Sequence, residues 1–140
     1  IALVPPVDPE QKKGNTMLLS GLHETSLDEY RRFLIPSRMV RQMELQEAGS
    51  VWLAKTPDAT SLAMIPSSSF EAWKAEHVCD DSDRRVILGS AVEKRWDKKH
   101  RIVVPAHLAQ YARLTALSPI VLISMEYYFE VWCEDDYRRL

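Results

Sequence analysis

Two arginines, Arg32 and Arg101, occupy equivalent places in two short stretches of the chain, LDEYRRFLIP and WDKKHRIVVP. In each stretch an aspartate lies four residues before the arginine, and a proline lies four residues after it. An arginine guanidinium can fork to the O6 and N7 atoms of a guanine base, or it can neutralise a phosphate. It can equally form an ion pair with the aspartate of its own stretch. The residue types and their spacing leave both roles open.

The second stretch lies in a strongly basic part of the chain. From Lys94 to Arg101 there are five basic residues and one acid, Asp97. The five are Lys94, Arg95, Lys98, Lys99 and Arg101. Such a cluster is the electrostatic footprint of a phosphate-binding surface, although a run of charges is also typical of a solvated hairpin. The first stretch is closer to neutral, because two acids precede Arg31 and Arg32.

Catalytic and metal-binding motifs are missing from the sequence. It contains no G-x-S-x-G, no Walker loop and no H-E-x-x-H. His77 and Cys79, followed by two aspartates, are metal-ligand types, but they lack the paired spacing of a structural zinc site. We therefore expect no enzymatic activity, no metal, no cofactor and no small-molecule substrate.

The composition is that of an ordinary globular protein. The chain has 140 residues, 27% of them charged and 46% hydrophobic, with a net charge of −2. It has no run of the ~18 apolar residues that a membrane helix needs, so we expect no membrane association. Two cysteines form no disulfide framework, which fits the reducing cytoplasm.

Both stretches belong to a longer internal repeat. A shift of about 69 residues, the distance from Asp28 to Asp97, aligns the aspartate, arginine and proline of the two stretches. Further on, VWLAK matches IVLIS, and LAMIPSSSF matches FEVWCEDDY. Two copies are too few for a solenoid. We expect instead a duplicated module whose halves pack on each other.

Each copy predicts the element order ββαββα, so the fold class is α+β, mainly β with short helices. AVEKRW and RIVV are short, apolar-rich strands separated by a polar tetrapeptide, which predicts a hairpin. Asp28 and Asp97 open these tetrapeptides, where a carboxylate can accept backbone N–H groups of the turn. Pro36 and Pro105 are expected to end the second strand and begin a helix.

The repeat also predicts how the chain is divided. Ser68 and Glu71 have the spacing of a capping box, which would begin the last helix of the first copy. The cluster of Asp and Ser at 80–83 predicts a turn or N-cap, followed by a short helix. The expected segments are a mobile, proline-rich leader (1–16), a first module (17–73), a connector (74–87) and a second module (88–140).

With these motifs, the chain resembles the MraZ family, which is built from two swapped-hairpin modules of the SpoVT/AbrB type. The resemblance rests on the two Asp-x-x-x-Arg-x-x-x-Pro copies and on Gly89-Ser90-Ala91, and it covers the chain from Met17 onwards. It implies a cytoplasmic, nucleoid-associated homo-oligomer, assembled as a ring, that binds double-stranded promoter DNA. The implied function is sequence-specific transcription regulation at the bacterial division and cell-wall gene cluster, including the protein's own gene.

Carried over by residue, the resemblance implies that the motif arginines contact DNA and that the aspartates and prolines shape the adjoining turns. The candidate DNA-binding residues are Arg32, Arg101, Lys99, Lys98, Arg95, Arg31 and Lys94, and the turn-shaping residues are Asp28, Asp97, Pro36 and Pro105.

The sequence departs from the family at one turn position. The family has glycine just before the motif arginine, where a positive φ is needed, and Arg31 and His100 stand there in this chain. Either the turn is of another type or the strain is tolerated. Two alternative functions stay open: an AbrB-like antitoxin that binds DNA, and an oligomeric scaffold that has lost its affinity for DNA.

Overall fold

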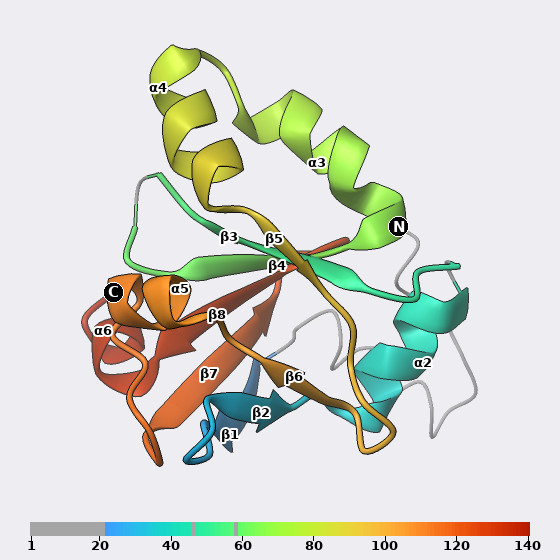
Figure 1. Cartoon of the computed structure of the whole chain (residues 1–140), viewed down its shortest axis with the longest axis vertical. Helices are drawn as coiled ribbons and strands as arrows, with labels where there is room; N and C mark the ends of the chain where they lie inside the picture. Colours follow the sequence, from blue (N-terminus) through green and yellow to red (C-terminus); the bar gives the residue numbers. More distant parts are fainter. Residues whose placement is uncertain (1–21, 46, 58) are drawn as a thin grey trace.

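The computed structural model describes residues 22–45, 47–57 and 59–140, which form one antiparallel sheet and a separate two-stranded ladder. The expected leader, 1–16, lies outside this range. The six strands of the sheet follow the order β1-β7-β8-β4-β3-β5, and β2 pairs with β6 (Figure 1). The strands are β1 (Leu22–Ser26), β2 (Arg32–Leu34), β3 (Val51–Lys55), β4 (Leu62–Pro66), β5 (Val92–Lys94), β6 (Arg101–Val103), β7 (Pro119–Ser124) and β8 (Phe129–Cys133).

In each half a short helix follows every two consecutive strands along the chain. The predicted order ββαββα is therefore confirmed in both copies. The helices of the first half are α2 (Ser37–Leu45), η1 (Ser67–Ser69) and α3 (Phe70–His77). Those of the connector and second half are α4 (Asp81–Asp83), the π-helical segment η2 (Arg84–Leu88), α5 (Ala106–Tyr111) and α6 (Glu134–Arg138). The α+β class, mainly β with short helices, is therefore confirmed.

The strands of the two halves are interleaved in the sheet, because each half adds an edge strand to the central strand pair of the other half. β1 of the first half pairs with β7, β5 of the second half pairs with β3, and β4 lies beside β8. The strands β1 with β2 and β5 with β6 do not form local strand pairs, and β2 and β6 are exchanged between the halves, as the expected swapped-hairpin fold implies. Their turns close locally, but each second strand exchanges partners and pairs with its counterpart from the other half.

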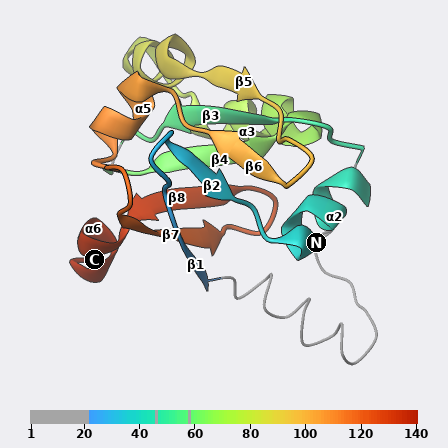
Figure 2. The same cartoon turned by 60° about the horizontal axis from the view of Figure 1, so that its bottom comes forward.

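The main hydrophobic core lies between the β2–β6 ladder and one face of the sheet. Phe33 and Ile102 point inward from the ladder and pack in one cluster with Leu53, Leu122 and Phe129 of the sheet. Figure 2 shows the ladder lying across the sheet. Because burial of large apolar side chains is the main favourable term in folding, this shared core explains why each half keeps its second strand against the other.

A second, smaller core covers the opposite face of the β3–β4 end of the sheet. Ala63 and Ile65 of β4 pack there against Phe70 and Trp73 of α3 and Ile87 of η2. Leu62 and Met64, the alternate residues of the same strand, belong to the main core. β4 is buried along its whole length because both faces of the sheet are covered there.

The N-terminal caps of α3 and α4 agree only in part with those predicted from the sequence. The predicted capping box is wrong: α3 has Ser69 at its N-cap, without a side-chain hydrogen bond, because Ser67–Ser69 form a 3-10 turn ahead of the helix. The predicted N-cap of the connector is confirmed, since Asp80 Oδ1 accepts the backbone N–H of Asp83 at 2.8 Å. Among the residues described, no helix has the length and apolar character to cross a membrane.

Candidate nucleic-acid interface

The first turn is organised around one carboxylate. Asp28 Oδ1 accepts the backbone N–H groups of Tyr30 at 2.9 Å and Arg32 at 2.8 Å. Asp28 Oδ2 accepts Nε–H of Arg32 at 2.8 Å. Desolvation acts to raise the pKa of Asp28, but the hydrogen bonds from Arg32 and Tyr30 outweigh it and hold the pKa below its ordinary value. The carboxylate therefore stays charged and holds the arginine in place.

The second turn repeats this arrangement. Asp97 Oδ1 accepts the backbone N–H groups of Lys99 at 2.8 Å and Arg101 at 2.9 Å, and Oδ2 accepts Arg101 Nε–H at 2.9 Å. The backbone hydrogen bond from Arg101 lowers the pKa of Asp97, desolvation opposes it, and the Arg101 side chain and Lys99 N–H lower it further. We call each Asp–Arg pair, Asp28–Arg32 or Asp97–Arg101, a clip.

Both turns keep the backbone conformation that glycine would favour. Arg31 has a φ of 61° and His100 a φ of 64°, so each lies in the left-handed region. The alternative that these substitutions change the turn type is therefore excluded, and the strain is tolerated. A non-glycine residue in this region costs about 1–2 kcal/mol.

The two strained residues also join the halves of the chain. The carbonyl oxygen of His100 accepts the N–H of Ile35 at 2.8 Å, and that of Arg31 accepts the N–H of Val104 at 2.8 Å. Arg31 Nε–H donates in turn to the Val104 carbonyl at 3.0 Å. Each bond extends the β2–β6 ladder by one pair, so turn geometry and strand exchange depend on each other.

The ladder presents a mixed face to solvent. The register pairs Arg32 with Val103 and Leu34 with Arg101, so these four side chains lie on the face opposite to the buried Phe33 and Ile102. Leu34 is 52% exposed and Val103 is 37% exposed. We call the set Arg32, Leu34, Arg101 and Val103 the outer ladder face.

The clips use only one nitrogen of each guanidinium. Within residues 22–45, 47–57 and 59–140, no hydrogen bond joins the η nitrogens of Arg32 or Arg101 to another group. The Arg32 guanidinium also lies 5.0 Å from the centre of the Tyr30 ring. The arrangement orients both arginines and leaves their forked ends available to a ligand, so the roles of clip and contact are compatible.

The remaining basic candidates fall into two places. Lys98 and Lys99 are exposed at the tip of the second turn, close in sequence to Arg101. Lys94 lies in β5, paired with Val51 of the sheet. The guanidinium of Arg95 lies beside Gly49, in the segment before β3. Lys94 and Arg95 therefore belong to the sheet edge, while the turn lysines adjoin the outer ladder face.

Each motif proline lies just before a helix. The carbonyl of Pro36 accepts the N–H groups of Met39 and Val40 at 2.9 and 3.1 Å. The carbonyl of Pro105 does the same for Leu108 and Ala109, both at 3.0 Å. Each proline thus accepts hydrogen bonds from the first turn of the helix that follows it. Each also lies just after the end of a ladder strand.

Sequence reasoning missed the apolar part of the outer ladder face. Leu34 and Val103 follow buried residues in RFL and RIV, so a run of apolar residues hides the exposed position. The signal was the alternation itself: a residue two positions after an exposed arginine lies on the same strand face.

Comparison with known proteins finds similarity to one family. A family model described as "MraZ protein, putative antitoxin-like" matches residues 87–140. A protein named Transcriptional regulator MraZ from Burkholderia cenocepacia (strain HI2424) is 29% identical over 125 residues, covering 86% of each chain. Namesakes from Burkholderia ambifaria (strain MC40-6) and Burkholderia mallei (strain SAVP1) are 29% identical over 124 residues, covering 86% of this chain and 85% of theirs. Residues 87–140 are therefore similar to the MraZ family model, and most of the chain is similar to proteins named transcriptional regulators.

Proposed function

We propose that this protein is a transcriptional regulator, not an enzyme, that binds double-stranded promoter DNA in a sequence-specific manner. The observation that carries the proposal is the outer ladder face, a two-stranded ribbon from which two clipped arginines project. The major groove of B-DNA admits a two-stranded β-ribbon, and arginine is the commonest reader of guanine there.

The clips supply the geometry that base reading needs. Each aspartate holds Nε of its arginine at 2.8 or 2.9 Å, so the guanidinium plane is oriented before DNA arrives. An arginine ordered in advance loses less side-chain entropy on binding. The Arg32 and Arg101 side chains are 27% and 31% exposed, which leaves their forked ends accessible.

Two features of the surroundings complete the interface. Lys98, Lys99 and Arg31 are exposed beside the turns, where they can neutralise phosphates without reading sequence. Leu34 and Val103 are apolar and exposed between the arginines, where they can contact the C5 methyl group of thymine. We propose that the arginines select guanine and that the apolar pair selects neighbouring thymine.

The family resemblance extends this proposal to assembly, location and target. A ring of subunits in the cytoplasm, associated with the nucleoid, would present several outer ladder faces to repeated DNA elements. Each face would then add to the overall avidity. The proposed target is the promoter of the division and cell-wall gene cluster, including the protein's own gene.

The test is binding to a duplex from upstream of the protein's own gene, followed by fluorescence anisotropy. It is run at two salt concentrations, with a scrambled duplex as competitor. We expect tight binding that the scrambled duplex does not displace and that weakens steeply with salt, because phosphate contacts release counterions. Equal affinity for both duplexes would contradict sequence-specific regulation at this promoter, and no binding to either duplex would favour the scaffold alternative.

A further inference from the structure

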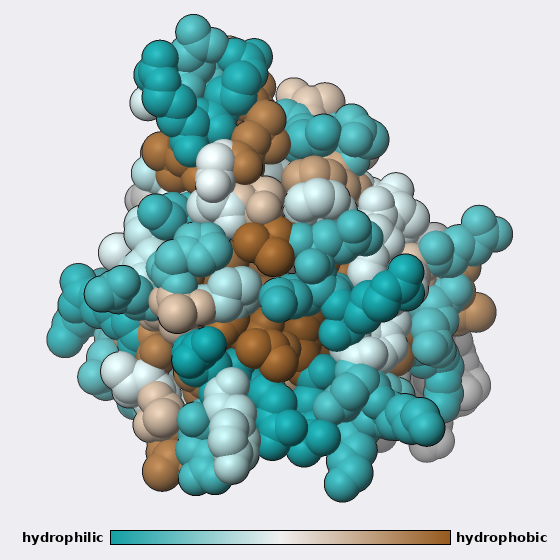
Figure 3. All heavy atoms as spheres, viewed as in Figure 1, coloured by the Kyte–Doolittle hydropathy of each residue, from teal (hydrophilic) through white to brown (hydrophobic). Residues whose placement is uncertain are grey.

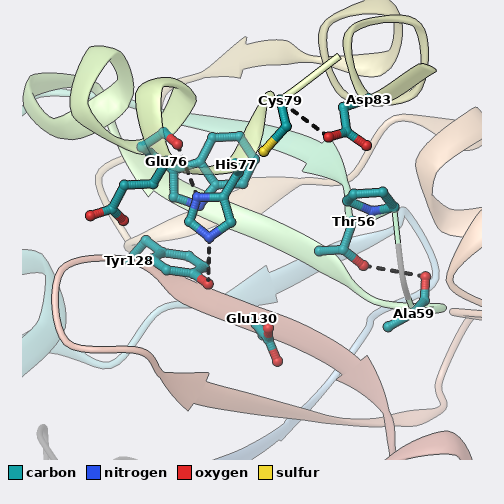
Figure 4. A pocket seen from close by; sticks show the side chains of 10 residues that line it. Thr56, Ala59, Glu76, His77, Cys79, Asp83, Tyr128 and Glu130 are labelled. Carbon is teal, nitrogen blue, oxygen red and sulfur yellow. Dashed lines mark hydrogen bonds between the residues drawn. The ribbon is translucent and has the colours of Figure 1, made fainter. Parts of the chain in front are cut away.

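A pocket of about 310 Å³ lies between α3, the segment that leads into α4, and strand β8. Glu76 and His77 line it from α3, Asp83 from α4, and Tyr128 and Glu130 from β8 and the residue before it (Figure 4). Glu130 pairs with Ala63, whose side chain belongs to the smaller core. The pocket is therefore on the side of the sheet opposite to the β2–β6 ladder, and its volume is that of a small-molecule site.

Three carboxylates line this pocket, and neutral groups hold each of them. Glu76 accepts the hydroxyl of Tyr127, Glu130 accepts the indole N–H of Trp132 at 2.9 Å, and Asp83 accepts the backbone N–H of Cys79 at 3.0 Å. In the described part of the chain none of the three carboxylates forms an ion pair. No lysine or arginine is among the lining residues. These hydrogen bonds hold the three negative charges in position, and no ion pair among the described residues balances them.

The tyrosines beside the pocket respond to this charge. Desolvation raises the pKa of Tyr127, and the hydrogen bond and charge of Glu76 raise it further. Desolvation also raises the pKa of Tyr128, with additional effects of the Glu130 and Glu76 charges. Desolvation is the largest cause of both shifts, and the nearby carboxylates add to it.

The wall of the pocket is aromatic and contains one unsatisfied donor. The rings of Trp73 and His77 are stacked with centroids 4.6 Å apart, and Tyr128 meets both edge-on. Trp73 is 1% exposed, and its Nε1 has no hydrogen-bond partner of accepted geometry. Its proximity to Tyr128 only partly opposes the rise in the pKa of that hydroxyl.

His77 lies between two polar groups of the pocket. Its Nδ1 lies 2.9 Å from the carbonyl oxygen of Trp73, which can only accept, so Nδ1 carries a proton. Its Nε2 lies 3.4 Å from the Tyr128 hydroxyl. The described residues contain no cluster of three or more metal ligands, so the pocket differs from a metal site.

We propose that this pocket binds a small organic cation that carries primary ammonium groups. An ammonium group has three donors and no acceptor, which complements carboxylates. Carboxylates from α3, α4 and β8 stand on different walls, so a molecule with two ammonium groups can pair with more than one of them. The aromatic wall attracts cations and packs against the aliphatic part of the ligand.

The probe is putrescine, titrated into the full-length protein by calorimetry at constant ionic strength. Its neutral analogue 1,4-butanediol and Mg²⁺ are titrated under the same conditions. We expect saturable binding of putrescine with a Kd of about 1 mM or lower. The diol and Mg²⁺ should bind at least about ten-fold more weakly, because the first lacks charge and the second retains its water shell.

Substitutions in the pocket locate the binding site. Glu130→Gln and Glu76→Gln keep the shape of the side chain and should each weaken putrescine binding by roughly five- to ten-fold. Glu71→Gln is the matched control, because Glu71 is on the same helix, 87% exposed, and paired with Lys74 outside the pocket. Circular dichroism checks that each variant is folded.

Several outcomes would overturn the proposal. They are no saturable binding of putrescine, equal binding of the diol, equal binding of Mg²⁺, or an equal loss in Glu71→Gln and in the folded pocket variants. The measurement contains no DNA, so its result is independent of whether the outer ladder face binds a promoter.

Discussion

The N–H of Ile35 donates to the carbonyl oxygen of His100 at 2.8 Å, although the two residues belong to different copies of the repeat. The reciprocal bond, from Val104 to Arg31, has the same length. The residue that ends each ladder strand is thus held by the turn of the other half. Each turn therefore supplies a hydrogen bond to the ladder strand of the other half.

This interlocking predicts that half of the chain will not fold alone as a monomer. A fragment of residues 88–140 keeps β7 and β8 but separates β6 from β2 and β5 from β3. We expect it to be unfolded or self-associated, as measured by circular dichroism and sedimentation. Adding a fragment of residues 17–87 should restore structure, and a folded monomer of either fragment alone would contradict the prediction.

The motif arginines should be required for DNA affinity but not for folding. Arg101→Ala should weaken specific binding by about 1–3 kcal/mol if its guanidinium forks to a guanine. Arg101→Lys should recover little of that loss, because an ammonium group does not fork. The measurement is anisotropy with specific and scrambled duplexes. An equal loss of affinity for both duplexes would assign Arg101 to phosphate contact. If neither Arg32→Ala nor Arg101→Ala lowers the affinity for DNA, the clips are not part of the interface.

Leu34 and Val103 of the outer ladder face are exposed, so they can be changed with little effect on stability, whereas the two arginines also belong to the clips. Figure 3 shows one face of the molecule, on which apolar side chains in the middle are surrounded by hydrophilic ones. Substitutions of this kind usually change stability by less than about 0.5 kcal/mol. Changes in binding can therefore be separated from changes in folding.

Leu34 and Val103 should read thymine through its methyl group. A specific duplex with uracil in place of thymine lacks only that methyl, so wild-type affinity should fall by about 0.5–1 kcal/mol for each buried contact. The Leu34→Ala/Val103→Ala variant should bind the thymine duplex less tightly and lose its preference over uracil. If the variant still distinguishes thymine from uracil as well as the wild type does, the methyl is read elsewhere.

The sequence predicted the element order well and the strand partners poorly. Helix and strand patterns are local, so VWLAK and LAMIP could be identified from their own residues. The hairpin signal is local too, and the Asp28 and Asp97 turns do close. The partner of each ladder strand is decided instead by burial of Phe33 and Ile102 in one shared core, which involves residues far apart in the chain.

The candidate sites show the same limit. The spacing of Asp97 and Arg101 within one turn could be interpreted directly from the sequence, and its geometry is as regular as that spacing suggests. The acidic pocket could not be foreseen, because Glu76 and Glu130 are 54 positions apart in the numbering. Strand β8 brings Glu130 to α3 only after the two halves have formed one sheet.

Replacing a strained turn residue with glycine should stabilise the protein. His100→Gly removes the cost of a φ of 64° while keeping the backbone bonds of the turn. We expect the free energy of unfolding to rise by about 0.5–1 kcal/mol. Glycine relieves the backbone strain in the folded state, but it also increases the entropy of the unfolded chain, which offsets part of the gain. Lys99→Gly is the matched control, because Lys99 is in the same turn without a positive φ, and it should be neutral or destabilising. Urea denaturation compares the two variants, and equal shifts in both would argue against strain at His100.

The clips should also make the protein sensitive to acid. The pKa of Asp97 in the folded protein is held below its ordinary value, mainly by the backbone N–H of Arg101 and against desolvation. A depressed pKa contributes stability above the unfolded value of about 3.9, and that contribution is lost as pH falls through the folded value. Asp28, whose pKa is also lowered, should behave in the same way.

The test is the melting temperature as a function of pH for the wild type and for Asp28→Asn/Asp97→Asn. At neutral pH the double variant should melt at a lower temperature, because an amide cannot accept the same charge-assisted hydrogen bonds. Between about pH 5 and pH 2 the wild type should lose more stability than the variant, so the two curves should converge. Asp81→Asn, an exposed residue of α4 that lies outside both turns, serves as the control and should follow the wild type. Curves for the wild type and the double variant that stay parallel through this range would show that the clips do not contribute to acid sensitivity.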